Sequence, residues 1–362
     1  MTHLPTHESD PLAAMLDRKS ARGRVYPVPD ARVMFVQVNK NACTSLKWMV
    51  AGIAGEDLSS FGPSLQASVG DEDDIHDRRQ WRKTPRLDQL DPEVRAQIHP
   101  SNGWFVFAVT RDPRSRLFSA WQSKLLLENP GYTSFQREPW YPRHPVTTAS
   151  IVEDFAEFVD LMLREPGHRI RGDGHFCDQV ELLHEDVVTY TDIYDVRDLG
   201  RLQTDLRQHL DRVGWKGELT LPRLNDTPLR ANPLPFANGV DAQIEKIYAA
   251  DFERFGDRWD FATIERNSKW TDADLAQVEL RASLGRRIAY LRNQAMAFRA
   301  EVVTERKRAD AEKRRADAAA KRVDRLRRRL RKRAVPPPPR HGRLRSMLDR
   351  LLRGMRRCLR RT

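Results

Sequence analysis

The sequence has no apolar run long enough to span a membrane, and residues 1–20 contain no signal-peptide core. It has only three cysteines, Cys43, Cys177 and Cys358, which are few, odd in number and far apart. They give no disulfide framework of the kind that stabilises small secreted domains. Together these absences lead us to expect a cytoplasmic protein.

Net positive charge is confined to one end of the chain. The 362 residues carry a net charge of +12, but residues 321–362 alone hold 18 Lys and Arg against 2 Asp. The first 320 residues are therefore mildly acidic. Because 40% of the residues are hydrophobic, the chain can also build a core of ordinary size. The asymmetry predicts a globular part and a basic tail with separate tasks.

Glycine is absent from the loop that looks most suited to binding an anion. Residues 31–50 (ARVMFVQVNKNACTSLKWMV) predict a buried strand over 33–38, a turn with Lys40, and a helix that begins near Thr44 and Ser45. The first N–H groups of a helix lack intrahelical partners and lie at the positive end of its dipole, so they attract anions. A triphosphate loop would need glycines and a lysine next to the hydroxyl. This loop instead suits one terminal phosphate or sulfate.

A second strand-to-helix junction carries an arginine and a serine. Residues 104–110 (WFVFAVT) form a continuous apolar run, which predicts a strand buried on both faces of a parallel sheet. Arg-Asp-Pro ends this strand, and a helix is expected from Arg114 onward. Arg111 and Ser119 could therefore hold a second phosphate. Two anion sites at the carboxyl ends of parallel strands suit a nucleotide with phosphates at both ends.

The order of the remaining segments predicts the domain organisation. Strands and helices alternate through residues 32–255, which indicates a three-layer α/β domain with a mostly parallel sheet. We expect residues 1–30 to be a flexible lead-in and residues 31–265 to be the folded domain. A long charged helix over 271–333, a Pro-rich linker over 334–341 and a basic amphipathic helix over 342–362 are expected to follow.

The long helix has a seven-residue apolar repeat. Residues 295, 302, 309, 316, 323 and 330 are Ala, Val, Ala, Ala, Val and Leu, although Glu305 and Glu312 interrupt the opposite seam. This pattern predicts a homodimeric coiled coil through residues 284–332, with a solvated single helix as the alternative. The leucine stripe of residues 342–362 predicts binding to an anionic membrane surface, which would place the protein at the inner face of the membrane. Nucleic-acid binding is not expected because it would not require that stripe; a solubilising tail stays open.

Several motifs together resemble one enzyme family. NKNACTSLK (39–47) resembles the 5′-phosphosulfate loop of the carbohydrate (Golgi-type) sulfotransferases, the group that contains the chondroitin and HNK-1 enzymes. FVFAVTRDPRSRLFSAW (105–121) resembles their 3′-phosphate motif. GHFCDQ, YTDIYDVRDLGRLQTDL and IYAADFERFG resemble further family segments and follow in the same order. The resemblance covers about residues 32–257.

This resemblance implies a P-loop-like sulfotransferase fold and a reaction. The donor would be 3′-phosphoadenosine 5′-phosphosulfate (PAPS), and the sulfuryl group would pass to a hydroxyl of a carbohydrate or glycolipid by in-line displacement, without a metal. Lys40 would neutralise charge on the leaving oxygens, and Arg111 and Ser119 would hold the 3′-phosphate. Lys47 would either support the first site or face solvent. The 5′-phosphate would be held by the loop and the helix start, residues Asn41, Ala42, Cys43, Thr44 and Ser45.

A hydroxyl acceptor also needs a base, for which histidine is well matched near neutral pH. His76 lies between the two phosphate motifs, where relatives place a catalytic histidine at the end of the next strand. His175 lies in the HFCDQ loop, in which Phe176 replaces the family's tryptophan. Both histidines remain candidates for the base. A counterpart of the family's N-terminal membrane anchor is not expected in this sequence.

Two other functions remain open from the sequence. The chain could be a catalytically inactive sulfotransferase-like scaffold that acts through its coiled coil and basic tail. It could also be a P-loop-like kinase, against which the missing glycines argue.

Overall fold

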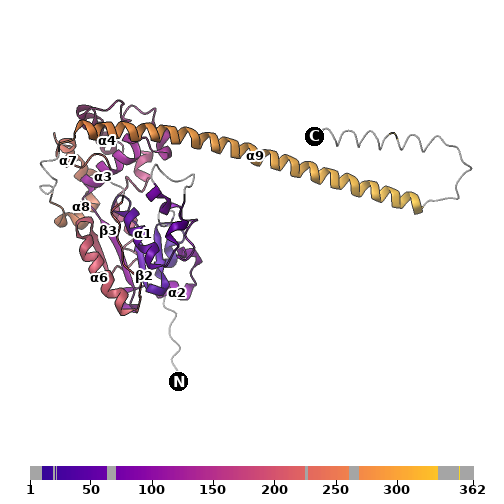
Figure 1. The fold of residues 1–362 in the computed structure, drawn as a ribbon, viewed down its shortest axis with the longest axis horizontal. Helices are drawn as coiled ribbons and strands as arrows, with labels where there is room; N and C mark the ends of the chain where they lie inside the picture. The colour runs from indigo at the N-terminus through magenta and orange to yellow at the C-terminus, as the bar shows by residue number, and fades with distance from the viewer. Residues whose placement is uncertain are drawn as a thin grey trace, which may run out of the picture. The chain divides into compact units, whose positions relative to one another are not determined.

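A computed structural model describes residues 10–18, 21, 23–62, 71–224, 227–260, 269–332 and 350 (Figure 1). The chain divides into two compact units, Met1–Asn293 and Gln294–Thr362. The Pro-rich linker over 334–341 lies outside the described residues, as does the basic segment over 342–362 apart from Arg350. The predictions for those two segments therefore stay predictions.

The first unit is built around a four-stranded sheet with the order β1-β2-β3-β4. The strands are β1 (Val25–Val28), β2 (Val33–Val36), β3 (Phe105–Thr110) and β4 (Asp192–Asp195). β1 is antiparallel to β2, whereas β2, β3 and β4 are parallel to one another. The predicted α/β fold with a mostly parallel sheet is confirmed.

Strand β1 lies within the segment that the sequence predicted to be a loose lead-in. Residues 25–28 pair with β2 along their whole length, so the prediction was wrong for these four residues. The strand is short and contains Pro27, which has no N–H to donate to a ladder. Because β1 is an edge strand with β2 on one side only, the proline is tolerated there.

Helices follow each parallel strand and complete the fold. The structure contains α1 (Cys43–Ile53), α2 (Pro92–Ala96), α3 (Pro113–Trp121), α4 (Thr148–Arg164), α5 (Gln179–Leu183), α6 (Leu199–Arg212), α7 (Val240–Ile247), α8 (Ala249–Phe255) and α9 (Asp272–Lys332). Residues 240–255 form two consecutive helices, α7 and α8. They meet at Tyr248, whose fully buried hydroxyl donates a hydrogen bond to the Phe176 carbonyl (2.7 Å).

Both faces of the sheet are covered. In β3, Phe105, Phe107 and Val109 point into one apolar cluster, and Val106 and Ala108 point into another. Side chains of α1 and α6 complete the first cluster, while α5, α8 and the 3-10 helix η1 (Pro11–Met15) complete the second. β2 and residues 105–109 of β3 read as unbroken apolar runs because each of these residues is buried, whichever face it points to.

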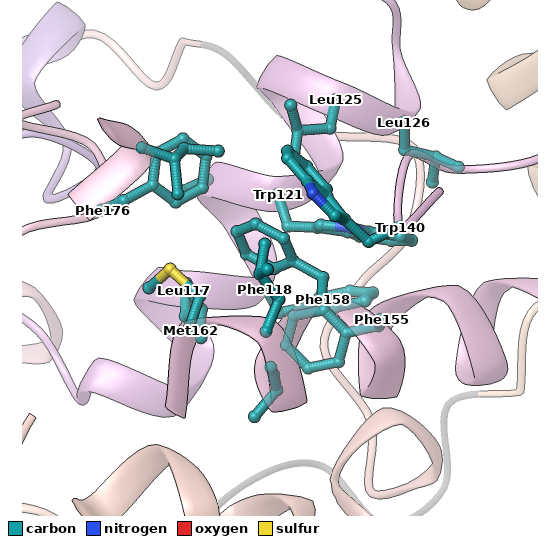
Figure 2. Close-up of a cluster of buried hydrophobic side chains, with 14 of the residues drawn as sticks. Leu117, Phe118, Trp121, Leu125, Leu126, Trp140, Phe155, Phe158, Met162 and Phe176 are labelled. Carbon is teal, nitrogen blue, oxygen red and sulfur yellow. The ribbon is translucent and has the colours of Figure 1, made fainter. Parts of the chain in front are cut away.

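A third apolar cluster joins the helices beyond the sheet. Phe118 and Trp121 of α3 pack against Phe155 of α4, and the Phe118 and Phe155 rings meet edge to face with centroids 5.2 Å apart (Figure 2). This cluster fixes α3, the helix that carries Ser115 and Ser119. Helix α3 continues directly into η7 (Gln122–Leu126), one turn of π-helix. The aromatic packing therefore supports one wall of the site described below.

Helix α9 belongs to both units. Within the first unit, Val278 and Ala282 are fully buried, and Arg286 forms an ion pair with Glu128 (3.0 Å). Gly285 contacts the end of η7 so closely that a Cβ atom there would lie 2.5 Å from the Leu127 and Glu128 carbonyl oxygens. In the second unit, every residue of α9 from 294 to 331 is exposed.

Replacing Gly285 with alanine should lower the free energy of unfolding of the first unit by about 1–3 kcal/mol, because the Cβ atom meets rigid backbone oxygens. Gly200 in α6 is the matched control: nothing lies within 4 Å of its Cβ position, so Gly200→Ala should be neutral or stabilising by up to about 1 kcal/mol. Urea unfolding of both variants checks the difference. Equal unfolding midpoints for the two variants would contradict the close contact.

Candidate active site

The loop between β2 and α1 takes an unusual backbone path. Lys40 has φ 71° and Ala42 has φ 53°, both in the left-handed region that glycine usually occupies. Each such residue costs roughly 1–2 kcal/mol for an L-amino acid. Ala42 also occupies the N-cap position of α1, and its side chain cannot accept a hydrogen bond from the first helical turn. The loop thus turns sharply without glycine and leaves the helix start without a side-chain cap.

Asn41 fastens this loop to the neighbouring strand. Its side-chain amide donates to the Val109 carbonyl (2.9 Å) and to Gln179 Oε1 (2.7 Å), and the residue is buried. The sequence had placed Asn41 among the anion-binding residues. In the structure its side chain instead holds the loop in place, because it is directed at the end of β3 and at α5 and does not line the cavity described below.

Arg116 of α3 holds the same loop from the other side. The Arg116 guanidinium is fully buried and donates to three backbone carbonyls, those of Asn39 (3.0 Å), Cys177 (2.7 Å) and Gly174 (3.1 Å). It therefore joins the β2–α1 loop to the loop that contains His175. Sequence reasoning singled out Arg111 in the same motif and missed Arg116, because a buried arginine that binds carbonyls has no distinctive sequence pattern.

Gln179 and Asp251 complete the support of both loops. The fully buried Asp251 carboxylate accepts hydrogen bonds from the backbone N–H groups of Gln179 (3.0 Å) and Val180 (2.9 Å). Gln179 in turn accepts from the Arg111 N–H (3.0 Å) and donates to the Arg111 carbonyl (2.8 Å). The HFCDQ and IYAADF segments, for which the sequence predicted no role beyond the resemblance, thus fix the end of β3.

Residues from the two predicted anion sites line one cavity of about 640 Å³. The seven predicted residues that line it are Lys40, Ala42, Cys43, Thr44, Ser45, Arg111 and Ser119. Sequence reasoning missed Ser115, Arg197 and residues 221–224, which line it as well. Ser115 lies one turn before Ser119 on α3, a helical spacing that could have identified it.

Two carboxylates also line the cavity, and each has a cationic partner. Asp112 lies 3.2 Å from Arg114, and Asp195 lies 2.7 Å from Arg197. Because both negative charges are compensated, they do not oppose the binding of an anion.

Arg111 lies where the two halves of the site meet. Its Nε donates to Ser115 Oγ (2.9 Å) and its Nη1 lies 3.4 Å from the Lys40 carbonyl oxygen. Burial lowers the pKa of the guanidinium, although the neighbouring Asp112 and Asp195 oppose the effect. Arg111, Ser115 and Ser119 also line an adjoining cavity of about 740 Å³ with Arg223 and Arg230. The arginine is therefore shared by two connected anion-attracting spaces.

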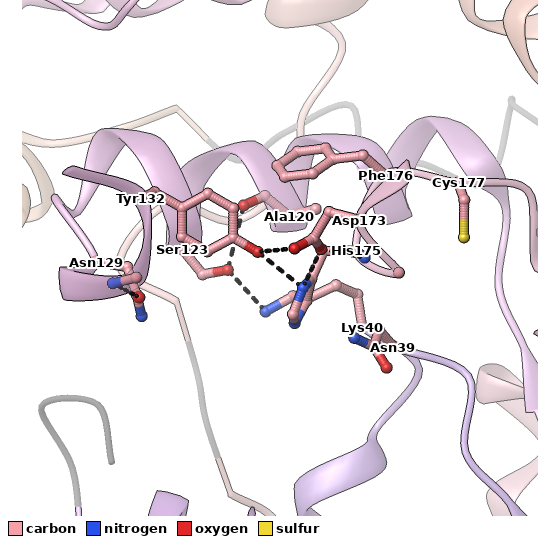
Figure 3. A network of polar contacts seen from close by, with 12 residues as sticks. Asn39, Lys40, Ala120, Ser123, Asn129, Tyr132, Asp173, His175, Phe176 and Cys177 are labelled. Atoms are coloured by element: carbon pink, nitrogen blue, oxygen red, sulfur yellow. Dashed lines mark hydrogen bonds and ion pairs between the residues drawn. The ribbon is translucent and has the colours of Figure 1, made fainter. Parts of the chain in front are cut away.

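The π-helical turn η7 supplies a partner for Lys40. The Lys40 ammonium donates to Ser123 Oγ (3.0 Å), and Ser123 donates to the Ala120 carbonyl (3.3 Å) (Figure 3). The sequence predicted a helix from Arg114 onward without a π-turn, so Ser123 was missed. A single π-turn changes which side chains face the site and is found often at functional positions.

His175 forms a carboxylate–imidazole pair close to Lys40 (Figure 3). Its Nδ1 lies 2.7 Å from Asp173 Oδ1, and the Tyr132 hydroxyl donates to Asp173 Oδ2 (2.9 Å). Burial and the charges of Lys124 and Lys40 lower the pKa of His175 to about 3, against the effect of Asp173. The imidazole is therefore neutral near pH 7. With its proton on Nδ1 facing Asp173, it keeps a lone pair on Nε2.

His76 has a different environment. It ends the 3-10 helix η4 (Asp71–His76), so the expectation that it ends a strand was wrong. Its Nε2 lies 2.9 Å from Thr44 Oγ1, and its Nδ1 lies 2.7 Å from Lys47 Nζ. Burial, followed by the charge of Lys47, holds the pKa of His76 well below its usual value. Lys47 itself is 2% exposed, which answers the question that the sequence left open: it does not face solvent.

Among the described residues, no group of three or more His, Cys, Asp or Glu side chains is arranged to hold a metal ion. In the same part of the chain, none of the helices has the length and apolar character needed to cross a membrane.

Comparison with known proteins gives one match. A family model described as the sulfotransferase family matches residues 25–256, which is more than half of the chain and includes every site residue named above. No curated protein and no solved structure matches the chain.

Proposed function

The chain belongs to the sulfotransferase family, and we propose that it moves the sulfuryl group of PAPS to a hydroxyl group of a carbohydrate or glycolipid. The observation that carries this proposal is that two motifs about seventy residues apart in the sequence line a single cavity with Lys40 and Arg111. Family membership supports sulfuryl transfer in general. The nature of the donor and of the acceptor is our proposal.

The cavity suits a donor with phosphates at both ends. Two cationic side chains, Lys40 and Arg111, come from different loops, and hydroxyls of α1 and α3 line the wall between them. The first turn of α1 adds backbone N–H groups that no N-cap side chain satisfies. The compensated charges of Asp112 and Asp195 leave the cavity able to accept an anion. PAPS would supply the activated sulfuryl group for this site.

Each part of the cavity has a role in this proposal. Thr44, Ser45 and the amides of the α1 start would hold the 5′-phosphate. Arg111 would hold the 3′-phosphate with Ser115 and Ser119, which approach from the same face of α3. Lys40 would stabilise negative charge on the leaving oxygen. Sulfuryl transfer resembles phosphoryl transfer in that positioning and charge stabilisation dominate the rate acceleration.

We assign the role of general base to His175, because one of its ring nitrogens, Nε2, is left without a proton. Asp173 accepts from Nδ1 and so orients the ring with its Nε2 lone pair unprotonated. His175 is also near enough to Lys40 for the lysine charge to lower its pKa. His76 differs because Lys47 and Thr44 occupy both of its ring nitrogens. A base must have a nitrogen that can accept the acceptor's proton, and only His175 of the two meets this condition.

The donor assignment can be tested by isothermal titration with adenosine 3′,5′-bisphosphate. Binding in the micromolar range is expected, and Lys40→Ala and Arg111→Ala should each weaken it at least about tenfold, as expected for loss of a charge-assisted contact. Lys246→Ala, on the exposed side of α7, is the matched control and should bind like wild type. Absence of binding in the wild-type protein would refute the proposal, and tight ATP binding instead would favour the kinase alternative.

The base assignment can be tested by transfer of ³⁵S from labelled PAPS to an extract of the native host. His175→Gln should lower the transfer rate by about 10²–10⁴, the usual contribution of a general base, while affinity for adenosine 3′,5′-bisphosphate stays unchanged. Because the pKa of His175 in the empty site is lowered to about 3, its base form persists in acid, and the wild-type kcat/KM, which reports the free enzyme, should stay level between pH 5.5 and 7.5. A tenfold loss of rate per pH unit below 6.5 would contradict this assignment.

We also propose that α9 pairs with α9 of a second copy. Apolar residues at the repeat positions are exposed on a single chain, with Val302 at 49% and Leu330 at 71%. A seven-residue repeat is best buried by a helix with the same repeat. The flanking positions are mostly basic, for example Arg306, Lys313 and Arg327. Repulsion between these charges would weaken the pair at low salt.

Light scattering after size exclusion tests the pairing with the full chain. The dimer fraction should rise between 50 and 500 mM NaCl, since the screening length falls from about 14 Å to about 4 Å over this range and the basic flanks repel each other less. Val323→Asp, at a repeat position, should shift the protein to monomer, whereas Ala318→Asp, which makes the same charge change outside the seam, should not. A monomer at every salt concentration would support the solvated single helix.

A further inference from the structure

Lys47 is a buried cation in the first helical turns after the anion-binding loop. It is 2% exposed, and its ammonium lies 2.7 Å from His76 Nδ1 and 5.3 Å from the centre of the Tyr26 ring. It is not among the residues that line the cavity. Hydrogen bonding from Lys47 to a bound anion must therefore pass through a neighbouring side chain.

The direction of the hydrogen bonds follows from the chemistry of the three groups. An ammonium can only donate, so His76 Nδ1 must accept from Lys47. The neutral ring then carries its proton on Nε2, which lies 2.9 Å from Thr44 Oγ1 and donates to it. Burial and the nearby charges of Lys47, Lys124 and Lys40 lower the pKa of His76, so the ring stays neutral.

Thr44 is the end of this chain of donors and is the member that lines the cavity. Since its oxygen accepts the His76 proton, its own hydroxyl proton takes no part in that hydrogen bond and is directed away from His76. Hydrogen bonds arranged in series polarise one another, and a cation at the start strengthens each donor along the series. The series of hydrogen bonds runs from Lys47 through the His76 imidazole to the Thr44 hydroxyl, which lines the cavity at the start of α1.

From this geometry we infer that Lys47 and His76 are positioning residues that orient the Thr44 hydroxyl as a hydrogen-bond donor to the 5′-phosphate of the donor nucleotide. The inference rests on the proposed function, because it names the ligand of the same cavity. It gives His76 a task other than proton abstraction. It also explains why a buried lysine lies beside a histidine, an arrangement that would be costly without a directed hydrogen bond.

The test compares two replacements of His76 by titration with adenosine 3′,5′-bisphosphate. Gln offers an oxygen to Lys47 and an N–H to Thr44, whereas Leu offers neither. His76→Leu should weaken binding about tenfold, and His76→Gln should restore affinity to within about threefold of wild type, as expected when a hydrogen bond to a charged ligand is lost and regained. A base at His76 would behave differently: both replacements would reduce transfer by a similar large factor and leave binding unchanged.

Thr44→Val and Thr44→Ser provide a second route in case the His76 or Lys47 variants fold poorly. Thr44→Val should weaken binding about as much as His76→Leu, Thr44→Ser should retain it, and adding His76→Leu or Lys47→Met to Thr44→Val should cause no further loss, because the chain already lacks its last member. Additive losses would overturn the inference. So would wild-type affinity in all single variants, whereas failure of the wild-type protein to bind would instead refute the proposed function.

Discussion

The site depends on a set of buried hydrogen bonds that ties together loops from distant parts of the sequence. Arg116 binds backbone carbonyls of both the β2–α1 loop and the loop that contains His175. Gln179 links the end of β3 to the buried Asp251. Each of these groups would be costly in an apolar interior without its partners, by several kcal/mol for the charged ones. We therefore expect the end of β3, the β2–α1 loop and the loop that contains His175 to form cooperatively. This explains why an anion loop without glycine can keep its strained path: its neighbours hold it.

The sequence predicted the elements whose burial makes them continuous and apolar. Strands β2 and β3, the helix start at Thr44 and the position of Arg111 could all be identified, because a strand buried on both faces has an unmistakable composition and the chemistry follows it directly. β1 was missed because Pro27 and its short length disguise an edge strand. Ser123 was missed because a π-turn breaks the spacing on which helix prediction depends. His76 was placed at the end of a strand by analogy, and the chain there forms a 3-10 helix.

Two histidines that looked equivalent in the sequence differ in what their ring nitrogens contact. A carboxylate on Nδ1 of His175 and an ammonium on Nδ1 of His76 select opposite tautomers. The sequence cannot supply this information, because Asp173 is only two residues from His175 whereas Lys47 is twenty-nine residues from His76. The difference between a proton acceptor and a positioning residue thus comes from the tertiary fold and not from the motif.

The clustering of cations around two neutral imidazoles has a consequence for the response of the fold to acid. Both histidines have lowered pKa values in the folded chain, so the unfolded chain binds more protons once the pH falls below about 6.5, the ordinary histidine pKa. Each group then costs the folded state about 1.4 kcal/mol per pH unit. A polyanion in the cavity would offset the surrounding positive charge and raise both pKa values. Occupancy of the site and tolerance of acid are thereby thermodynamically linked: burial and the same charges that attract the ligand together make the empty fold sensitive to protons.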